Sequence, residues 1–176
     1  MIYEPREDSH LLQKYVKKLA KGSVLDIGTG SGIQAVTASK NTKVTSVLAI
    51  DIQEEVIDHC LRNLDPKKIT FKESNLFSNV EESFDTIIFN PPYLPDDAKV
   101  KDLTLDGGKE GYELIKEFLE QVKNHLNKDG IILLLFSSLT NKEKIDSLIK
   151  KENFIFNLLE KQHIFFEDLF VYQITL

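Results

Sequence analysis

The sequence has little cysteine and no long apolar run. Cys60 is the single cysteine among 176 residues, so an internal disulfide, the usual staple of small secreted domains, is excluded. No stretch approaches the roughly 18 apolar residues that cross a membrane as a helix. The first residues have neither the basic segment nor the apolar core of a secretion signal. We therefore expect a cytoplasmic protein without membrane association.

An excess of basic residues is also missing. The chain has 22 Lys and Arg against 28 Asp and Glu, a formal net charge of -6, which disfavours a protein that grips phosphates by electrostatics alone. The four histidines are scattered and have no metal-ligand spacing to one another or to Cys60. We expect no metal site and no direct binding of nucleic acid.

What the sequence does contain is an alternation of strand-like and helix-like segments. Apolar runs typical of strands lie at 23–27, 44–52, 69–72, 84–89 and 131–136, and helical spacing of apolar residues lies at 9–20, 33–40, 54–64, 112–126 and 141–151. Asp8 or Ser9 is the expected N-cap of the first helix, and Asp129-Gly130 is expected to end the fourth. The segments 153–160 and 165–176 are close enough to pair as an antiparallel hairpin. This pattern predicts one α/β domain over residues 1–176, built on a doubly wound, mostly parallel sheet.

A glycine-rich turn joins the first strand to the second helix. Gly28, Gly30 and Gly32 let the backbone approach a ligand and present helix N-terminal N–H groups to it, although their spacing is not the dinucleotide G-x-G-x-x-G. A plain tight turn is the alternative. Asp51 favours a ligand, because it ends the next strand 21 residues after Gly30, where a carboxylate can accept hydrogen bonds from ribose hydroxyls.

Two further strand ends have an ambiguous role. Asp26 can pair with a ligand ammonium or hydrogen-bond the amides of its own loop, and we favour ligand contact because the site otherwise lacks a counter-charge for a cation. Asn75-Leu76 can hydrogen-bond and pack against a purine ring, or form an ordinary turn. Both interpretations of Asn75-Leu76 stay open at this point.

The most specific signal is Asn90-Pro91-Pro92-Tyr93, which follows the apolar strand ending at Phe89. Prolines cannot continue a sheet ladder, so the chain leaves the strand here and displays Asn90 and Tyr93 at the edge where open α/β sheets bind ligands. The amide oxygen of Asn90 and the carbonyl of Pro91 can accept hydrogen bonds from an amine or amide without using its lone pair, and Tyr93 can stack on a planar group. The segment from Leu94 to Glu110 loses periodicity and predicts a mobile loop beside this site.

Together these segments resemble class I S-adenosylmethionine-dependent methyltransferases, and more narrowly the HemK/PrmC family of release-factor glutamine methyltransferases. Four segments in order carry this resemblance: Tyr3-Glu4-Pro5-Arg6-Glu7-Asp8-Ser9, Leu25-Asp26-Ile27-Gly28-Thr29-Gly30-Ser31-Gly32, Asn90-Pro91-Pro92-Tyr93 and Leu105-Asp106-Gly107-Gly108. The resemblance covers nearly the whole chain. It implies a seven-stranded Rossmann-like sheet with an antiparallel C-terminal strand.

The resemblance also implies a site. Asn90, Pro91, Pro92 and Tyr93 would hold a substrate amide, which the resemblance implies is the glutamine of a Gly-Gly-Gln motif in a class 1 release factor. S-adenosylmethionine would be bound by the N-terminal segment 3–9, called the leader, by the glycine loop and by the ends of the next strands. The residues are Tyr3, Pro5, Asp8, Ser9, Asp26, Gly28, Gly30, Ser31, Gly32, Asp51, Ile52, Asn75, Leu76 and Asn90.

The sequence departs from the family pattern in two respects. Bacterial members have an N-terminal helical domain, whereas here the leader begins at Met1, and Asn75 stands where Asp is common. In the first departure the chain resembles the compact archaeal and eukaryotic branch. In that branch the eukaryotic enzymes are activated by a small zinc-binding partner that pairs with the sheet edge. The third strand, 69–72, is the expected edge.

Two rival functions remain at this level. A nucleic-acid methyltransferase acting on the amino group of adenine or guanine also fits Asn90-Pro91-Pro92-Tyr93, but the acidic balance disfavours it. A non-catalytic S-adenosylmethionine-binding scaffold is the alternative outside enzymes, and the intact Asn-Pro-Pro-Tyr turn argues against it.

Overall fold

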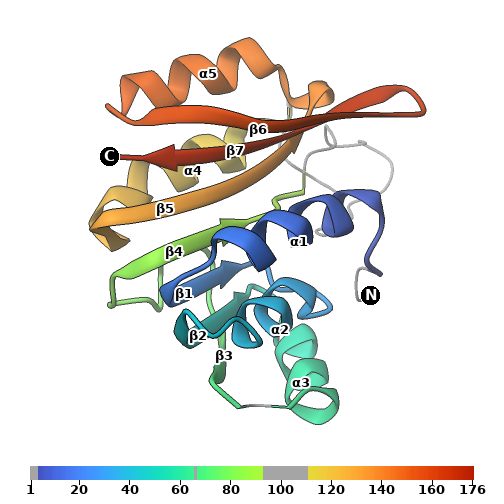
Figure 1. Ribbon diagram of the computed structural model, residues 1–176, viewed down its shortest axis with the longest axis vertical. Helices are drawn as coiled ribbons and strands as arrows, with labels where there is room; N and C mark the ends of the chain where they lie inside the picture. Colours follow the sequence, from blue (N-terminus) through green and yellow to red (C-terminus); the bar gives the residue numbers. More distant parts are fainter. Residues whose placement is uncertain (1–3, 66, 93–110) are drawn as a thin grey trace.

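Seven strands form one sheet in the order β3-β2-β1-β4-β5-β7-β6 (Figure 1), in a computed structural model that describes residues 4–65, 67–92 and 111–176. The strands are β1 (Gly22–Ile27), β2 (Val44–Asp51), β3 (Ile69–Glu73), β4 (Phe84–Phe89), β5 (Leu126–Ser137), β6 (Ile155–Ile164) and β7 (Glu167–Thr175). The helices are α1 (Glu7–Leu19), α2 (Ile33–Ser39), α3 (Glu54–Asn63), α4 (Glu113–Val122) and α5 (Lys142–Lys151), with short 3-10 turns at Lys123–His125 and Ser138–Thr140.

The sheet confirms the predicted topology. β3, β2, β1, β4 and β5 are parallel, whereas β7 runs antiparallel to both of its neighbours, β5 and β6. The strand order reverses between β1 and β4, which lie side by side in the middle of the sheet. Ligands of open α/β sheets bind beyond the carboxyl ends of the strands at such a reversal.

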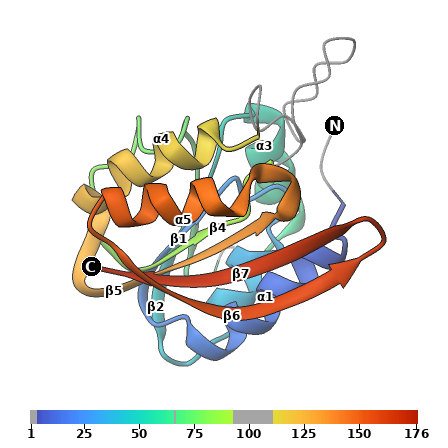
Figure 2. The ribbon, with the colours of Figure 1, turned by 90° about the horizontal axis from the view of Figure 1, so that it is seen from above.

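Both faces of the sheet are buried, as the continuous apolar strands predict. Alternate residues of β1, β4 and β5 belong to two separate cores: Leu25, Ile87 and Leu134 pack on one side, and Val24, Ile88 and Leu133 on the other. The first core is completed by α4 and α5, and the second by α1 and α2 (Figure 2). Helices thus hold the central strands rigidly from two sides.

The first helix begins earlier than the sequence predicts. The N-cap is Arg6, in extended conformation, while Asp8 and Ser9, the expected caps, are buried within the first turn of α1. Their positions have other uses: the Asp8 carboxylate accepts a hydrogen bond from Asn90 Nδ2, and the Ser9 carbonyl accepts one from Gln34 Nε2. The prediction of a cap at Asp8 or Ser9 was wrong, because these residues connect α1 to its neighbours.

The prediction that Asp129-Gly130 ends the fourth helix was also wrong. α4 ends at Val122, and Asp129-Gly130 lies inside β5, in an irregular stretch where the pairing shifts from Phe84↔Leu126 to Thr86↔Ile131. A side chain at position 130 would place its Cβ 2.9 Å from the Asn127 carbonyl oxygen and 3.0 Å from that of Phe84. The glycine therefore marks a close backbone approach within a strand.

The last two strands form the predicted hairpin. Their register runs from Ile155↔Thr175 to Ile164↔Glu167, so only two residues make the turn. The turn of this hairpin projects beyond the end of β5 (Figures 1 and 2). The outer strands of the sheet are β3, as predicted, and β6. None of the helices in the described part of the chain is long and apolar enough to cross a membrane.

Candidate active site

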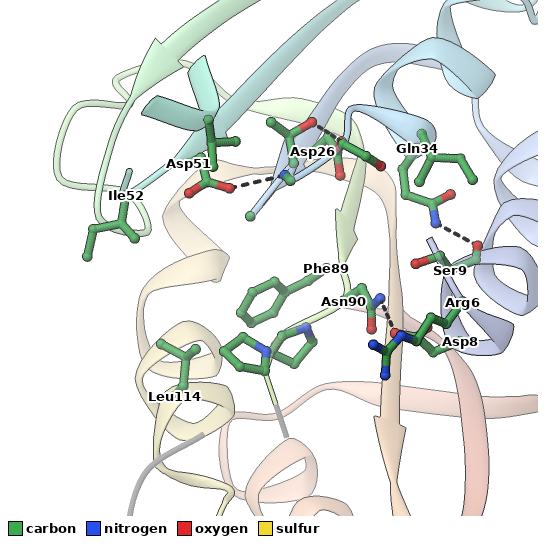
Figure 3. A pocket seen from close by; sticks show the side chains of 18 of the residues that line it. Arg6, Asp8, Ser9, Asp26, Gln34, Asp51, Ile52, Phe89, Asn90 and Leu114 are labelled. Carbon is green, nitrogen blue, oxygen red and sulfur yellow. Dashed lines mark hydrogen bonds between the residues drawn. The ribbon is translucent and has the colours of Figure 1, made fainter. Parts of the chain in front are cut away.

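A cavity of about 520 Å³ lies beyond the carboxyl ends of β1, β2, β3 and β4 (Figure 3). Its volume is typical of a site for a small organic molecule. The sequence predicts this location, and most of the residues predicted for the cofactor and substrate meet here. The predicted residues that line the cavity are Asp8, Ser9, Asp26, Gly28, Gly30, Ser31, Asp51, Ile52, Asn75, Leu76, Asn90, Pro91 and Pro92.

The glycine loop contributes through two of its three glycines. Gly28 and Gly30 line the cavity with φ of 66° and 51°, and a Cβ added to Gly28 would meet no atom within 4 Å. A side chain there would occupy open space beside the loop. Gly32 lies outside the lining: its φ is 77°, and a Cβ would come within 2.4 Å of Leu64 Cδ1. Gly32 thus allows α2 to pack closely against α3.

Asp51 ties the glycine loop to the end of β2. Its Oδ2 accepts a hydrogen bond from the Gly30 amide at 3.1 Å, and its Oδ1 accepts one from the Gln53 amide at 3.0 Å. Burial raises the pKa of this carboxyl above its ordinary value, and the amides of Gln53 and Gly30 oppose the rise. The carboxylate is fixed in place with a face toward the cavity.

Asp26 hydrogen-bonds its own loop and also faces the cavity, so its contact with a ligand stays a prediction. Its Oδ2 accepts hydrogen bonds from Thr29 Oγ1 at 2.7 Å and from the Ala35 amide at 3.1 Å, so it does organise its own loop. It also lines the cavity. Burial raises the pKa of Asp26 to about 7, although the bonds from Thr29 and Ala35 oppose this rise. A cation in the cavity would find an acidic group that lacks a counter-charge.

Asn75-Leu76 is both a turn and a wall of the cavity. The Ser78 amide donates to the Asn75 carbonyl, and the Ser74 hydroxyl donates to the Leu76 carbonyl. Leu76 has a φ of 45°, which is unusual for a branched residue and places its side chain in the buried core beside the cavity. Ile52, which is 49% exposed, lines the same cavity. These two apolar side chains can flank a flat ring.

Asn90 presents an unpaired acceptor. Its Nδ2 donates to Asp8 Oδ2 at 2.9 Å, which fixes the orientation of the amide, while Oδ1 is buried without a hydrogen-bond partner in the described part of the chain. Figure 3 shows this amide near Phe89 and Arg6, across the cavity from Asp26 and Asp51. An unpaired buried oxygen costs free energy unless a ligand donor satisfies it. Pro91 and Pro92 continue the same wall.

The leader residues divide into two groups. Asp8 and Ser9 line the cavity from the first turn of α1, whereas Pro5 is half-buried and lies outside the lining. Tyr3, Tyr93, the segment 94–110 and with it Leu105-Asp106-Gly107-Gly108 lie outside the described residues. Their predicted roles stay predictions.

The sequence analysis missed two contributions. Gln34, in the first turn of α2, lines the cavity and has a buried Oε1 without a partner among the described residues. A single polar residue on the buried side of an apolar helix was the available signal. The β6–β7 hairpin also reaches the cavity through Ile164, Phe165 and Glu167. Only the tertiary structure brings this distant segment to the site.

The described lining is strongly acidic. Glu7, Asp8, Asp26, Asp51 and Glu167 contribute carboxyl groups, and Arg6 is the one basic residue. Such a cavity suits a cationic ligand and disfavours a polyphosphate. No group of three or more histidine, cysteine or acidic side chains with metal-binding geometry occurs within residues 4–65, 67–92 and 111–176.

Sequence comparison relates the chain to methyl-transferring proteins. Residues 6–163 match the family model described as "Methyltransferase small domain". The chain is 35% identical to "Putative protein N5-glutamine methyltransferase" of Methanocaldococcus jannaschii, in a match that covers 97% of this chain and 89% of that protein. It is 34% identical to a release factor glutamine methyltransferase of Streptococcus pneumoniae, where the match covers 64% of this chain and 44% of the longer bacterial protein.

Structural comparison supports the same fold. The Mtq2–Trm112 complex of E. cuniculi, described as responsible for methylation of the eRF1 translation termination factor, contains a chain that superposes with a TM-score of 0.79. The two chains are 22% identical, and the match covers 99% of this chain and 98% of that one.

Proposed function

The chain belongs to the methyltransferase small domain family and depends on S-adenosylmethionine as its methyl donor, and on this basis we propose that it methylates the side-chain amide of a protein glutamine. The observation that carries the proposal is the orientation of Asn90. Its Nδ2 is held by Asp8, and its buried Oδ1 has no hydrogen-bond partner among the residues that the structure describes.

The residues present fit S-adenosylmethionine. When bound, this cofactor supplies a methyl group on a positively charged sulfur. The acidic lining complements that charge, and the open space beside Gly28 leaves room for a ligand against the backbone. The unpaired Gln34 Oε1 and Asn90 Oδ1 provide acceptors that protein donors leave unused. A dinucleotide would instead bring phosphates to a wall with five carboxyl groups.

We assign the cofactor contacts by the chemistry of each wall. Asp26 and the glycine loop would hold the ammonium end, because Asp26 is the most deeply buried of the acids there. Asp51 would accept hydrogen bonds from the ribose hydroxyls, and Ile52 and Leu76 would flank the adenine. Asp8 and Ser9 would cover the same ligand from α1.

The acceptor amide would be positioned by the end of β4. Asn90 Oδ1 and the Pro91 carbonyl would each accept a hydrogen bond from one N–H of the substrate amide, so that its nitrogen is held in one orientation. Stacking by Tyr93 remains part of this proposal. Orientation of two reactants in one site is worth up to roughly 7 to 11 kcal/mol of barrier, so small displacements of Asn90 have large effects on rate.

The glutamine of a class 1 release factor is the substrate that we propose. Relatives named for glutamine methylation match this chain, and the match with the Methanocaldococcus relative covers 97% of this chain and 89% of that protein. The nucleic-acid alternative has to place a polyanion beside the acidic cavity. The scaffold alternative leaves the oriented Asn90 amide without a role.

A transfer assay with labelled cofactor tests this proposal. The acceptors are a recombinant class 1 release factor with Gly-Gly-Gln, the same protein with that glutamine replaced by asparagine, duplex DNA and tRNA. We expect label only in the first. Label in DNA or tRNA and none in the release factor would refute the proposed substrate.

The Asn90 role has its own test. Asn90→Ala removes the acceptor for the substrate and should lower kcat by about 10²-fold or more, as expected when a positioning contact is lost. S-adenosylhomocysteine affinity, measured by calorimetry, should change far less. Asn157→Ala, at an exposed position of β6 outside the cavity lining, is the matched control and should change neither kcat nor cofactor affinity. A collapse of cofactor affinity in Asn90→Ala would assign Asn90 to the cofactor instead.

We further propose that the β3 edge binds a small activating partner, for which the resemblance implies a zinc-binding protein. Support comes from the position of β3 at the edge of the sheet, with Thr70, Lys72 and Glu73 exposed, and from the description of the E. cuniculi structure as a complex with Trm112. Light scattering with and without such a partner tests it. A chain that stays monomeric and methylates a release factor equally fast alone would contradict the need for an activator.

A further inference from the structure

The turn between β6 and β7 holds two exposed phenylalanines beside the cavity. Phe165 is 85% exposed and Phe166 is 98% exposed, so the rings bury almost nothing in the protein's own core. We call this pair the hairpin tip. Adjacent exposed aromatic side chains are uncommon on a protein that functions without a partner surface.

The local backbone gives no reason for phenylalanine at this turn. Ile164 pairs with Glu167, so Phe165 and Phe166 are the two loop residues, and Phe165 has a φ of 40°. Two-residue hairpin turns with positive φ at the first central position favour glycine, and positive φ is strained for a bulky residue. The aromatic pair therefore disagrees with the turn chemistry, which points to a role other than folding.

Hydrogen bonds and ion pairs fix the residues at the base of the hairpin tip. The Ser137 hydroxyl donates to the Glu167 carboxylate, and the Asp168 amide donates to Ser138 Oγ at 3.0 Å. Across the two strands, Asp168 pairs with Lys161 and with His163, each at 2.9 Å. The charged side chains at the base of the hairpin tip thus have partners within the protein. The two phenylalanine rings are the groups left to contact another molecule.

Part of the hairpin tip belongs to the wall of the cavity. Ile164, Phe165 and Glu167 line the same cavity as Asn90 and Pro91, while Phe166 lies outside that lining. The exposed ring of Phe165 is thus a part of the cavity wall that also faces solvent. The cofactor cannot account for Phe166, because a ligand inside the cavity leaves that ring in water.

We propose that Phe165 and Phe166 dock apolar side chains of the substrate protein next to the residue whose amide enters the site. This inference rests on the proposed function, since it takes the acceptor to be a protein. Buried aromatic anchors at the centre of an interface carry a large share of its binding energy, so loss of both rings should weaken substrate binding strongly.

The test uses three variants of the full chain. Phe166→Ser removes the ring outside the cavity lining. Phe165→Gly combined with Phe166→Ser removes both rings and places glycine where φ is positive, so the turn should fold at least as well. Leu61→Ser, at a side chain of α3 that is 56% exposed, is the matched control for loss of surface apolar area.

Steady-state methylation of a recombinant release factor with Gly-Gly-Gln, calorimetry with S-adenosylhomocysteine and light scattering are measured for each variant. We expect the double variant to raise KM for the release factor by about tenfold or more, with kcat, cofactor affinity and melting temperature close to wild type. Phe166→Ser should raise KM by a smaller factor, and Leu61→Ser should leave it unchanged.

Three outcomes would overturn the inference while the proposed function stands. KM in the double variant equal to that in Leu61→Ser would remove any role in docking. A matching loss of S-adenosylhomocysteine affinity in Phe166→Ser would assign the rings to the cofactor. A wild-type dimer that the variants dissociate would assign them to a second copy of the chain. A wild-type protein that does not label the release factor would refute the proposed function itself.

Discussion

At the scale of single residues, Asp26 shows how the site keeps a carboxyl group in an apolar setting. It is 2% exposed and receives two hydrogen bonds, from Thr29 and Ala35, at one oxygen. Burial raises its pKa from 3.8 to about 7, so the carboxyl is mostly protonated below that pH and mostly ionised above it. Binding a cation would favour the ionised form.

The raised pKa of Asp26 predicts a pH-dependent stability. Between pH 4 and 7 the unfolded chain has lost a proton that the folded chain still holds, so the free energy of unfolding falls as pH rises. Asp26→Asn keeps an oxygen for Thr29 and Ala35 and removes the titration. Urea unfolding should show the variant more stable than wild type at pH 8, relative to pH 4, by up to about 4 kcal/mol.

Asp85→Asn is the control for this experiment. The bonds from Asn127 and Ser23 lower the pKa of Asp85 below its usual 3.8, so this carboxyl is ionised in both the folded and the unfolded chain above about pH 4. Asp85→Asn should therefore destabilise the protein by nearly the same amount at pH 4 and at pH 8. An Asp26→Asn difference that is the same at both pH values would show that Asp26 titrates normally in the folded protein.

At the scale of elements, hydrogen bonds to the first turn of α1 hold this helix against the site. Asn90 at the end of β4 donates to Asp8, and Gln34 in α2 donates to the Ser9 carbonyl at 2.8 Å. A second bond between the same helices, from Gln13 Nε2 to Thr37 Oγ1 at 2.9 Å, involves residues outside the cavity lining. The two glutamines join the same pair of helices but differ in their contact with the cavity.

This difference predicts a selective loss of cofactor affinity. Gln34→Leu removes the unpaired Oε1, which we expect to accept a hydrogen bond from the cofactor ammonium, and bonds to charged groups contribute about 1.5–3 kcal/mol. Calorimetry should show weaker binding of S-adenosylhomocysteine, by about tenfold or more, and unchanged binding of methylthioadenosine, which lacks the ammonium. Gln13→Leu should change neither. Equal losses for both ligands in Gln34→Leu would mean that the residue only positions α1.

At the scale of the whole molecule, strand and helix periodicity predicted the order of elements, because each segment has to bury an apolar face at period 2 or 3.6. The errors came from tertiary contacts. Asp8 and Ser9 looked like caps but connect α1 to β4 and α2, and Asp129-Gly130 looked like a helix stop but occupies a shifted part of β5. Local chemistry alone does not reveal such partners.

The residues of the site also fall into two groups, those that the sequence predicted and those that only the tertiary structure brings there. Asp26, Asp51 and Asn90 follow strands directly, and parallel strands bring their carboxyl ends together, so the sequence was enough to predict that they meet. The turn of the β6–β7 hairpin, more than 70 residues beyond Asn90, reaches the cavity only because β7 pairs antiparallel with β5. No pattern in the sequence around Phe165-Phe166 predicts that this segment lies at the cavity.

The net charge of the whole chain predicts that it binds a protein substrate and does not bind nucleic acid. A net charge of -6 and five acidic side chains in the cavity lining oppose the approach of a phosphate backbone. Non-specific DNA-binding proteins reach dissociation constants of about 10⁻⁴–10⁻⁶ M at physiological salt. We expect fluorescence anisotropy to show no saturation with labelled duplex DNA or tRNA up to about 100 μM protein, while a labelled release factor binds. Micromolar tRNA binding that weakens steeply with added salt would indicate a local basic surface that overrides the net charge, and would favour the nucleic-acid alternative.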